Sequence, residues 1–148
     1  MIRRRVLALL LATMASGGPV YAGSPAVNAH HGLAIDGFDP VAYFTRGKAT
    51  RGSNAHSVMW RGAVWYFVSA ENRELFESNP HVYAPKYGGY CAYSVALGGT
   101  SVADPTAWEI YGGRLYLVRD TEIRTIWKQD IAGNIDRADA NWPAVLSR

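Results

Sequence analysis

The stretch WEIYGGRLYLV, residues 108–118, carries the clearest folding signal of the chain. Both of its halves, Trp108–Tyr111 and Arg114–Val118, contain aromatic and branched side chains, which favour β-strands. The Gly112-Gly113 pair between them is typical of a two-residue hairpin turn. The stretch therefore predicts an antiparallel β-hairpin, in which the two strands pair locally instead of joining a parallel sheet.

A second predicted hairpin lies earlier in the chain, in HSVMWRGAVWYFVS, residues 56–69, with Arg61-Gly62 at its turn. A helix is predicted after each hairpin. Ser69 caps the first helix, which Pro80 stops, and Asp120 caps the second. The two hairpin–helix units differ too much in sequence to be identified as a repeat.

The remaining signals predict short helices. Asp39-Pro40 starts one, since aspartate caps helices and proline suits the first helical position. Another covers Tyr90–Leu97, and Gly133-Asn134 separates the last two helices of the chain. Hairpins and helices in this order predict an α+β fold, with two β-hairpins and packed short helices in a single domain over residues 34–148.

The beginning of the chain resembles an export signal. Basic residues Arg3–Arg5 precede the apolar run Val6–Ala15, and Val20–Ala22 supplies small residues for cleavage. Residues 1–22 are therefore predicted to be a signal peptide and residues 23–33 a flexible arm, in a periplasmic or secreted protein that is not membrane-embedded after cleavage. Without residues 1–22, twelve basic and twelve acidic residues remain. This balance argues against nucleic acid as a partner.

Several segments match the motifs of one family. They are Asp36–Phe44 (DGFDPVAYF), Ala55–Ser57 (AHS), Trp60–Phe67 (WRGAVWYF) and Phe76–Pro85 (FESNPHVYAP). Through them the chain resembles the YHS domain family. The stretch YGGYCAY, residues 87–93, and the tail segments 130–134 and 138–143 are similar to the exported, stand-alone branch of that family. The resemblance covers most of the chain after the signal peptide.

The resemblance implies a connection with metal ions, because YHS domains also occur fused to heavy-metal-transporting ATPases. In those proteins, cysteines in an Asp-Pro-Val-Cys segment and a Tyr-Phe-Cys segment point to a metal site. This chain has Ala42 and Val68 at these two positions, and Ala55 replaces the tyrosine of the family name, whereas His56 and Ser57 remain. Any metal site must therefore be built differently, around Cys91 and histidine.

Cys91 is the only cysteine, so no disulfide can form within the chain. Three interpretations stay open: a buried apolar residue, a soft-metal ligand, or a nucleophile. For the two active roles His56 is the expected partner, at the start of a predicted strand. Met59 is a third candidate ligand, although in a continuous strand it faces away from His56.

The sequence thus predicts a non-enzymatic protein that binds a transition metal and sequesters or delivers it. Copper is the expected ion and zinc a second candidate, with Cys91, His56 and Met59 as ligands and a metal-transport protein as a candidate partner. The alternative is a metal-free module whose aromatic pocket, shaped at the Gly88-Gly89 hinge, binds a small ligand or a protein. A thiol enzyme using Cys91 and His56 is the third interpretation.

Overall fold

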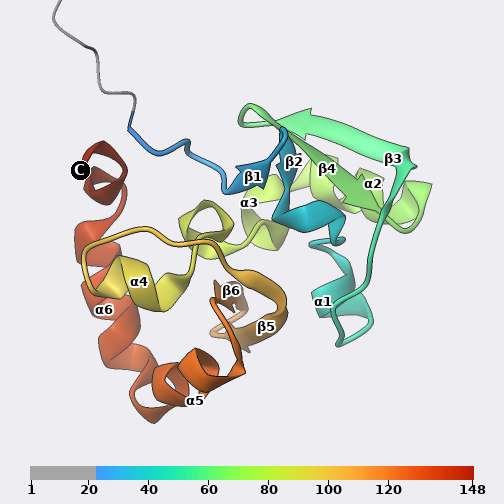
Figure 1. The fold of residues 1–148 in the computed structure, drawn as a ribbon. Coiled ribbons are helices and arrows are strands. Elements are labelled where there is room, and N and C mark those ends of the chain that lie inside the picture. The colour runs from blue at the N-terminus through green and yellow to red at the C-terminus, as the bar shows by residue number, and fades with distance from the viewer. Residues whose placement is uncertain (1–22) are drawn as a thin grey trace, which may run out of the picture.

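The computed structural model describes residues 23–148, so the predicted signal peptide, residues 1–22, lies outside the described part. Figure 1 shows helices packed around two separate β-structures. This arrangement confirms the predicted α+β fold with two hairpins in a single compact domain. In the described part, no helix is both long and apolar enough to cross a membrane.

The first β-structure is a four-stranded sheet in the order β1-β2-β4-β3. Its strands are β1 (Ala29–His30), β2 (Leu33–Ala34), β3 (Ser53–Trp60) and β4 (Ala63–Phe67). The predicted hairpin is formed by β3 and β4, with positive φ angles at both Arg61 and Gly62. A type I′ turn requires such angles at its two central residues.

The predicted flexible arm, residues 23–33, is bound to the domain along its length. Val27 is 2% exposed in the core, and β1 and β2 belong to the sheet. The Asn28 backbone N–H donates to the Gly88 carbonyl at 2.8 Å, and the Asn28 side chain donates to the Gly89 carbonyl. The flexible-arm prediction is wrong because this polar, glycine-containing stretch is anchored by the backbone of Gly88-Gly89.

The second β-structure is the hairpin of β5 (Asp104–Tyr111) and β6 (Arg114–Val118). Its turn, Gly112-Gly113, again has positive φ at both residues. The turn and β6 are as predicted, whereas β5 begins four residues earlier than Trp108. A register irregularity between Asp104 and Trp108 separates this early part of β5 from the regular pairing.

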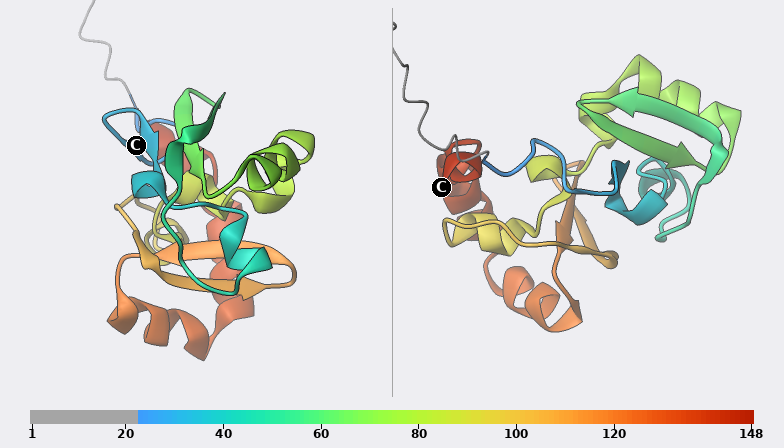
Figure 2. Two further views of the ribbon diagram at one scale, coloured as in Figure 1. Left: turned by 90° about the vertical axis from the view of Figure 1, so that its right-hand side faces the viewer. Right: turned by 45° about the horizontal axis from the view of Figure 1, so that its top comes forward.

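Six α-helices connect and cover the strands in the described part. They are α1 (Ala42–Thr45), α2 (Ala70–Ser78), α3 (Pro80–Tyr83), α4 (Ala92–Ala96), α5 (Thr121–Gln129) and α6 (Ile131–Asn141). Short 3-10 turns occur at Ile35–Gly37, Lys86–Gly89 and Ala144–Ser147. Figure 2 shows α5 and α6 on the side of the β5-β6 hairpin that faces away from the first sheet.

The capping predictions are confirmed in atomic detail. The Ser69 hydroxyl accepts a hydrogen bond from the Asn72 N–H, and the Asp120 carboxylate accepts one from the Ile123 N–H at 2.8 Å. The first of these helices, α2, ends at Ser78, just before Pro80, as predicted, and Pro80 then starts the short helix α3, because proline is tolerated at a first helical position. One helix boundary was predicted wrongly. Helix α6 starts after Asp130 and continues through Gly133-Asn134, since the Asp130 carboxylate caps it.

The two hairpin–helix units repeat each other in structure, although their sequences did not indicate it. Strands β3 and β4, the Ser69 cap, α2 and the start of α3 each have a counterpart 51 positions later, in β5, β6, the Asp120 cap, α5 and the start of α6. The register irregularities also correspond, at Ser53/Ser57 and Asp104/Trp108. We call residues 33–83 the first unit and residues 84–134 the second unit.

Each unit contains an equivalent pair of aromatic rings in tilted contact. In the first unit Trp65 and Phe76 have ring centroids 5.3 Å apart, and in the second unit Tyr116 and Trp127 are 5.5 Å apart. All four residues are buried. The helix of each unit is thus attached to its hairpin by the same contact, made with different residues.

Candidate functional site

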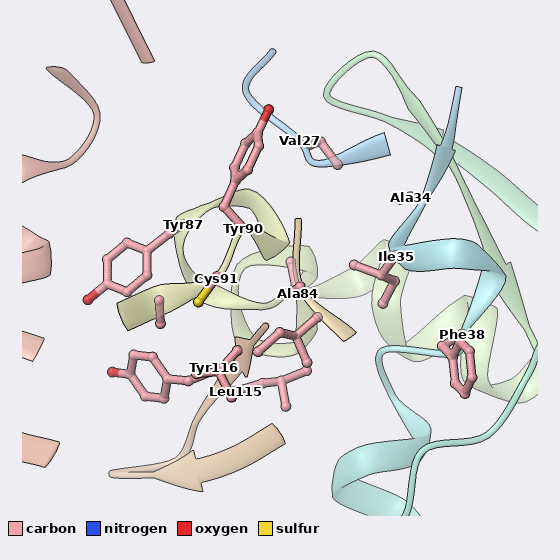
Figure 3. Packing of buried hydrophobic residues seen from close by; sticks show 14 of the residues in the cluster. Val27, Ala34, Ile35, Phe38, Ala84, Tyr87, Tyr90, Cys91, Leu115 and Tyr116 are labelled. Carbon is pink, nitrogen blue, oxygen red and sulfur yellow. The ribbon is translucent and has the colours of Figure 1, made fainter. Parts of the chain in front are cut away.

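The predicted metal ligand Cys91 lies in the hydrophobic core. It directly precedes α4, its backbone N–H donates to the Ser101 carbonyl at 2.9 Å, and it is 1% exposed. Figure 3 shows its sulfur within the cluster that includes Leu115 and Tyr116 of β6. A thiol enclosed in this way packs as a small apolar group.

The other two predicted ligands lie on β3, the outer strand of the first sheet. His56 is half-buried beside the irregularity of this strand, and Met59 is 65% exposed. Figures 1 and 2 show β3 and α4 in different parts of the molecule. Within residues 23–148, no three His, Cys, Asp or Glu side chains gather to hold a metal ion. The residues predicted to share a metal therefore belong to elements that pack separately.

A cleft between the two units brings aromatic and charged side chains together. Its volume is about 150 Å³. Its aromatic walls come from Trp60, Trp65, Tyr87 and Trp142. Its charged side chains are Arg61, Lys86 and Arg114, with His81 beside them. We call it the inter-unit cleft.

The wall from the first unit is held in place by the core. The Trp65 indole N–H donates to the Trp60 carbonyl at 3.1 Å, and the two indole rings meet edge to face at 5.8 Å. Phe76 packs against both rings. At the hairpin turn, the Arg61 guanidinium carbon lies 4.8 Å from the Trp60 ring centroid, a cation–π contact. This wall is therefore a fixed aromatic surface with a positive charge at its rim.

The opposite wall starts at Tyr87, whose φ of 57° is unfavourable for a residue with a side chain. The Tyr87 hydroxyl donates to Asp139 Oδ1 at 2.9 Å, and Lys86 Nζ lies 3.3 Å from the same oxygen. Burial raises the pKa of Tyr87, and the hydrogen bond to Asp139 raises it further. Tyr87 is thus a neutral phenol at physiological pH. The Trp142 ring, 5.8 Å from the Tyr87 ring, completes this wall.

Arg114 enters the cleft from the first position of β6, directly after the glycine turn. Its Nε atom is buried and has no hydrogen-bond partner. Within residues 23–148, its side chain forms no hydrogen bond and has no carboxylate within 4.0 Å. Burial of Nε without an acceptor removes part of the hydration of this guanidinium without replacing it.

A second cavity of about 170 Å³ lies where the N-terminal strands meet the second unit. It is lined mainly by apolar side chains such as Ile35, Val102 and Leu117, with His30 and Asp36 as its ionisable groups. No lysine or arginine lines this second cavity. The two cavities are similar in volume, so the concentration of positive charge distinguishes the inter-unit cleft.

Comparisons with protein-family models, with curated proteins and with solved structures found no match for this chain. The resemblance to the YHS family therefore stays a prediction. Any functional conclusion has to come from the geometry of the described residues.

Sequence reasoning anticipated an aromatic pocket near Gly88-Gly89, but it did not find the positive charge of that pocket. The signal was present in the two hairpins, because Arg61 occupies one turn and Arg114 directly follows the other. Each arginine is ordinary in its own segment. Their convergence depends on how the two units pack, which no local pattern reports.

Proposed function

We propose that the protein binds a small organic ligand in the inter-unit cleft. The observation that carries this proposal is the cleft itself, in which three indole rings and one phenol surround a volume of about 150 Å³. A cavity of roughly this volume accepts a single aromatic ring. Concave sites with aromatic walls and a few polar groups are the usual form of small-molecule sites.

Binding without covalent chemistry is favoured by the residues of the cleft. Among the described residues that line it, none is Ser, Thr, Cys, Asp or Glu, so its lining offers no hydroxyl or thiol nucleophile and no carboxylate base. Tyr87 keeps its proton because its pKa is raised by burial. The cleft therefore offers contact area, hydrogen-bond donors and positive charge.

We place this binding function in a periplasmic or secreted protein of the YHS type. The location is supported by the signal-like start, Arg3–Arg5 followed by Val6–Ala15. The family is supported by the motifs in residues 36–44 and 60–67. N-terminal sequencing of exported protein tests the location, and an intact Met1 terminus would refute cleavage.

Copper or zinc binding stays a prediction, and no contact of the described residues favours it over the cleft. Titration of reduced protein with Cu(I), compared between the wild type and Cys91→Ser, tests it directly. If the metal role holds, the variant loses affinity for the ion. Because Cys91 is 1% exposed, we expect equal and weak binding in both proteins.

The proposed ligand site is tested by two-dimensional NMR of the five indole N–H groups. Trp60, Trp65 and Trp142 line the cleft, whereas Trp108 and Trp127 do not. The last two are therefore internal controls in every spectrum. Each signal is assigned with a single Trp→Phe variant, and the protein is then titrated with a panel of small ring compounds.

Ligand binding in the cleft predicts saturable shifts of the Trp60, Trp65 and Trp142 signals, with little change of the Trp108 and Trp127 signals. If no compound shifts the three cleft signals, or if all five shift together, the proposed site is refuted. A further check is Trp142→Ala, which removes one wall near the C-terminus and should weaken every ligand that binds there.

A further inference from the structure

We infer that the ligand of the inter-unit cleft is a small planar anion, an aromatic or conjugated carboxylate, with Arg114 as its anchor. This inference rests on the proposed function and adds the chemical class of the ligand. Its basis is the charge, the unsatisfied hydrogen bonding and the size of the cleft.

The charge in the cleft is positive and largely uncompensated. Of its three cationic side chains, only Lys86 has an acidic partner within 4.0 Å among the described residues, the exposed Asp139. Arg61 contacts the Trp60 ring and Arg114 contacts no carboxylate. Low-dielectric walls strengthen the attraction of such charges for an anion. A neutral ligand would leave the half-buried Arg114 without a counter-charge.

Arg114 differs from the other half-buried arginines of residues 23–148. Arg124 donates from Nε and Nη2 to Glu109 Oε2 at 3.1 and 2.9 Å, and Arg73 lies 3.6 Å from Glu77. Only Arg114 among these three has no carboxylate beside it. The guanidinium fork is suited to a carboxylate, which can accept two hydrogen bonds from it. A carboxylate from solution would thus supply to Arg114 the hydrogen bonding that Glu109 supplies to Arg124.

The fold does not require an arginine at this position. The structural counterpart of Arg114 in the first unit is Ala63, which is 1% exposed and begins β4 in the same way. A small apolar residue therefore satisfies the equivalent hairpin position. Arg114 is better explained by what it faces in the cleft than by the packing of its strand.

The size and the walls of the cleft define the rest of the ligand. A volume of about 150 Å³ suits one ring with a small substituent. Flat rings pack well against the indoles of Trp60 and Trp142 and the phenol of Tyr87, all of which line the cleft. A planar body between these rings, with its carboxylate toward Arg114, matches both the apolar and the charged parts of the site.

The experiment compares three probes by calorimetry and by the indole NMR signals: benzoate, its neutral analogue benzamide, and inorganic phosphate. We expect benzoate to bind about tenfold more tightly than benzamide, since the difference is one charge-assisted contact. Arg114→Ala should remove most of this preference, because benzoate loses its charge-assisted contact, and should weaken benzamide much less. The matched control is Arg46→Ala, which removes an exposed arginine outside both cavities and should alter neither ligand.

The outcomes separate this inference from the proposed function. If benzamide binds as tightly as benzoate, the cleft remains a ligand site and the anion inference fails. If phosphate binds as tightly as benzoate, the planar part of the inference fails. If no probe shifts the cleft indoles, both proposals fail. Because Ala occupies the equivalent position of the first unit, Arg114→Ala is expected to fold, and an unchanged melting temperature verifies it.

Discussion

The two units have the same backbone plan, and they differ in the side chains that they direct to the cleft. At the hairpin turns, Arg61 of the first unit corresponds to Gly112 of the second, and both have positive φ. At the start of the second strand, Arg114 of the second unit corresponds to Ala63 of the first. The repeated backbone thus forms the walls of a cleft, whereas the charges are specific to each unit. Architecture and ligand chemistry are encoded at different positions.

The aromatic contact that the units share predicts the largest effects on stability. Phe76→Ala and Trp127→Ala each remove a buried ring that attaches a helix to its hairpin. Each should reduce the free energy of unfolding by about 3–5 kcal/mol. Urea unfolding followed by circular dichroism measures both. A loss below about 1 kcal/mol in one variant alone would show that the two contacts are not equivalent.

Asp39 of the first unit and its counterpart Tyr90 of the second unit predict smaller effects on the free energy of unfolding, and unequal ones. The buried Asp39 carboxylate accepts hydrogen bonds from the backbone N–H groups of Val41, Ala42 and Val68 and from the Asn72 side chain. Its counterpart, Tyr90, donates one hydrogen bond to the Pro25 carbonyl at 2.8 Å.

Removal of the Asp39 carboxylate in Asp39→Ala leaves several buried donors without acceptors and should cost about 3 kcal/mol. Tyr90→Phe loses a single hydrogen bond and should cost about 1 kcal/mol. Chemical denaturation of the two variants side by side provides the comparison. Equal losses would contradict the view that the buried Asp39 network contributes more to stability than the single hydrogen bond of Tyr90 does.

The two helix caps differ in their dependence on pH. Ser69→Ala should cost about 1 kcal/mol at any pH, because a hydroxyl does not titrate in this range. The pKa of Asp120 is lowered by the hydrogen bond from the Ile123 N–H and by Arg119. Because its folded pKa lies below the unfolded value, Asp120 stabilises the fold above about pH 4 and loses this effect as the pH falls further.

Asp120→Ala should therefore destabilise the protein at about pH 7 and have a smaller effect at about pH 3, whereas Ser69→Ala should show no such trend. Thermal unfolding at the two pH values measures the difference. Parallel pH profiles for the two variants would contradict the assignment of the acidic cap.

At Cys91 we expect the smallest effect on stability, and the prediction there concerns the reactivity of the thiol. Its enclosure in the core predicts slow alkylation of the native protein and fast alkylation in urea. Mass spectrometry after timed exposure to iodoacetamide measures both rates. Rapid, pH-dependent alkylation of the native protein would support the thiol-enzyme interpretation and contradict the packing described for Cys91.

Local patterns predicted the elements well and their convergence poorly. Gly112-Gly113 defined a turn, and Ser69 and Asp120 defined caps, because each signal is complete within a few neighbouring residues. The repeat was missed because the backbone plan is shared by almost entirely different residues. Over residues 53–79 and 104–130, the identical pairs are Gly62/Gly113, Glu71/Glu122 and Arg73/Arg124.

The residues predicted to share a metal lie on separately packed elements for a similar reason. Cys91, His56 and Met59 were selected for their chemistry, whereas their separation follows from the packing of α4 and β3. The cleft was missed as a charged site because its arginines are distant in sequence. Local patterns do not determine which distant side chains meet.

The most direct test of the central claim is a crystal structure of the protein with 4-bromobenzoate, in which the bromine atom marks the ligand by its anomalous signal. The account predicts a single strong peak in the inter-unit cleft, between the rings of Trp60 and Trp142, with the carboxylate on Arg114. A peak in the second cavity beside His30, with the cleft empty of ligand, would contradict it.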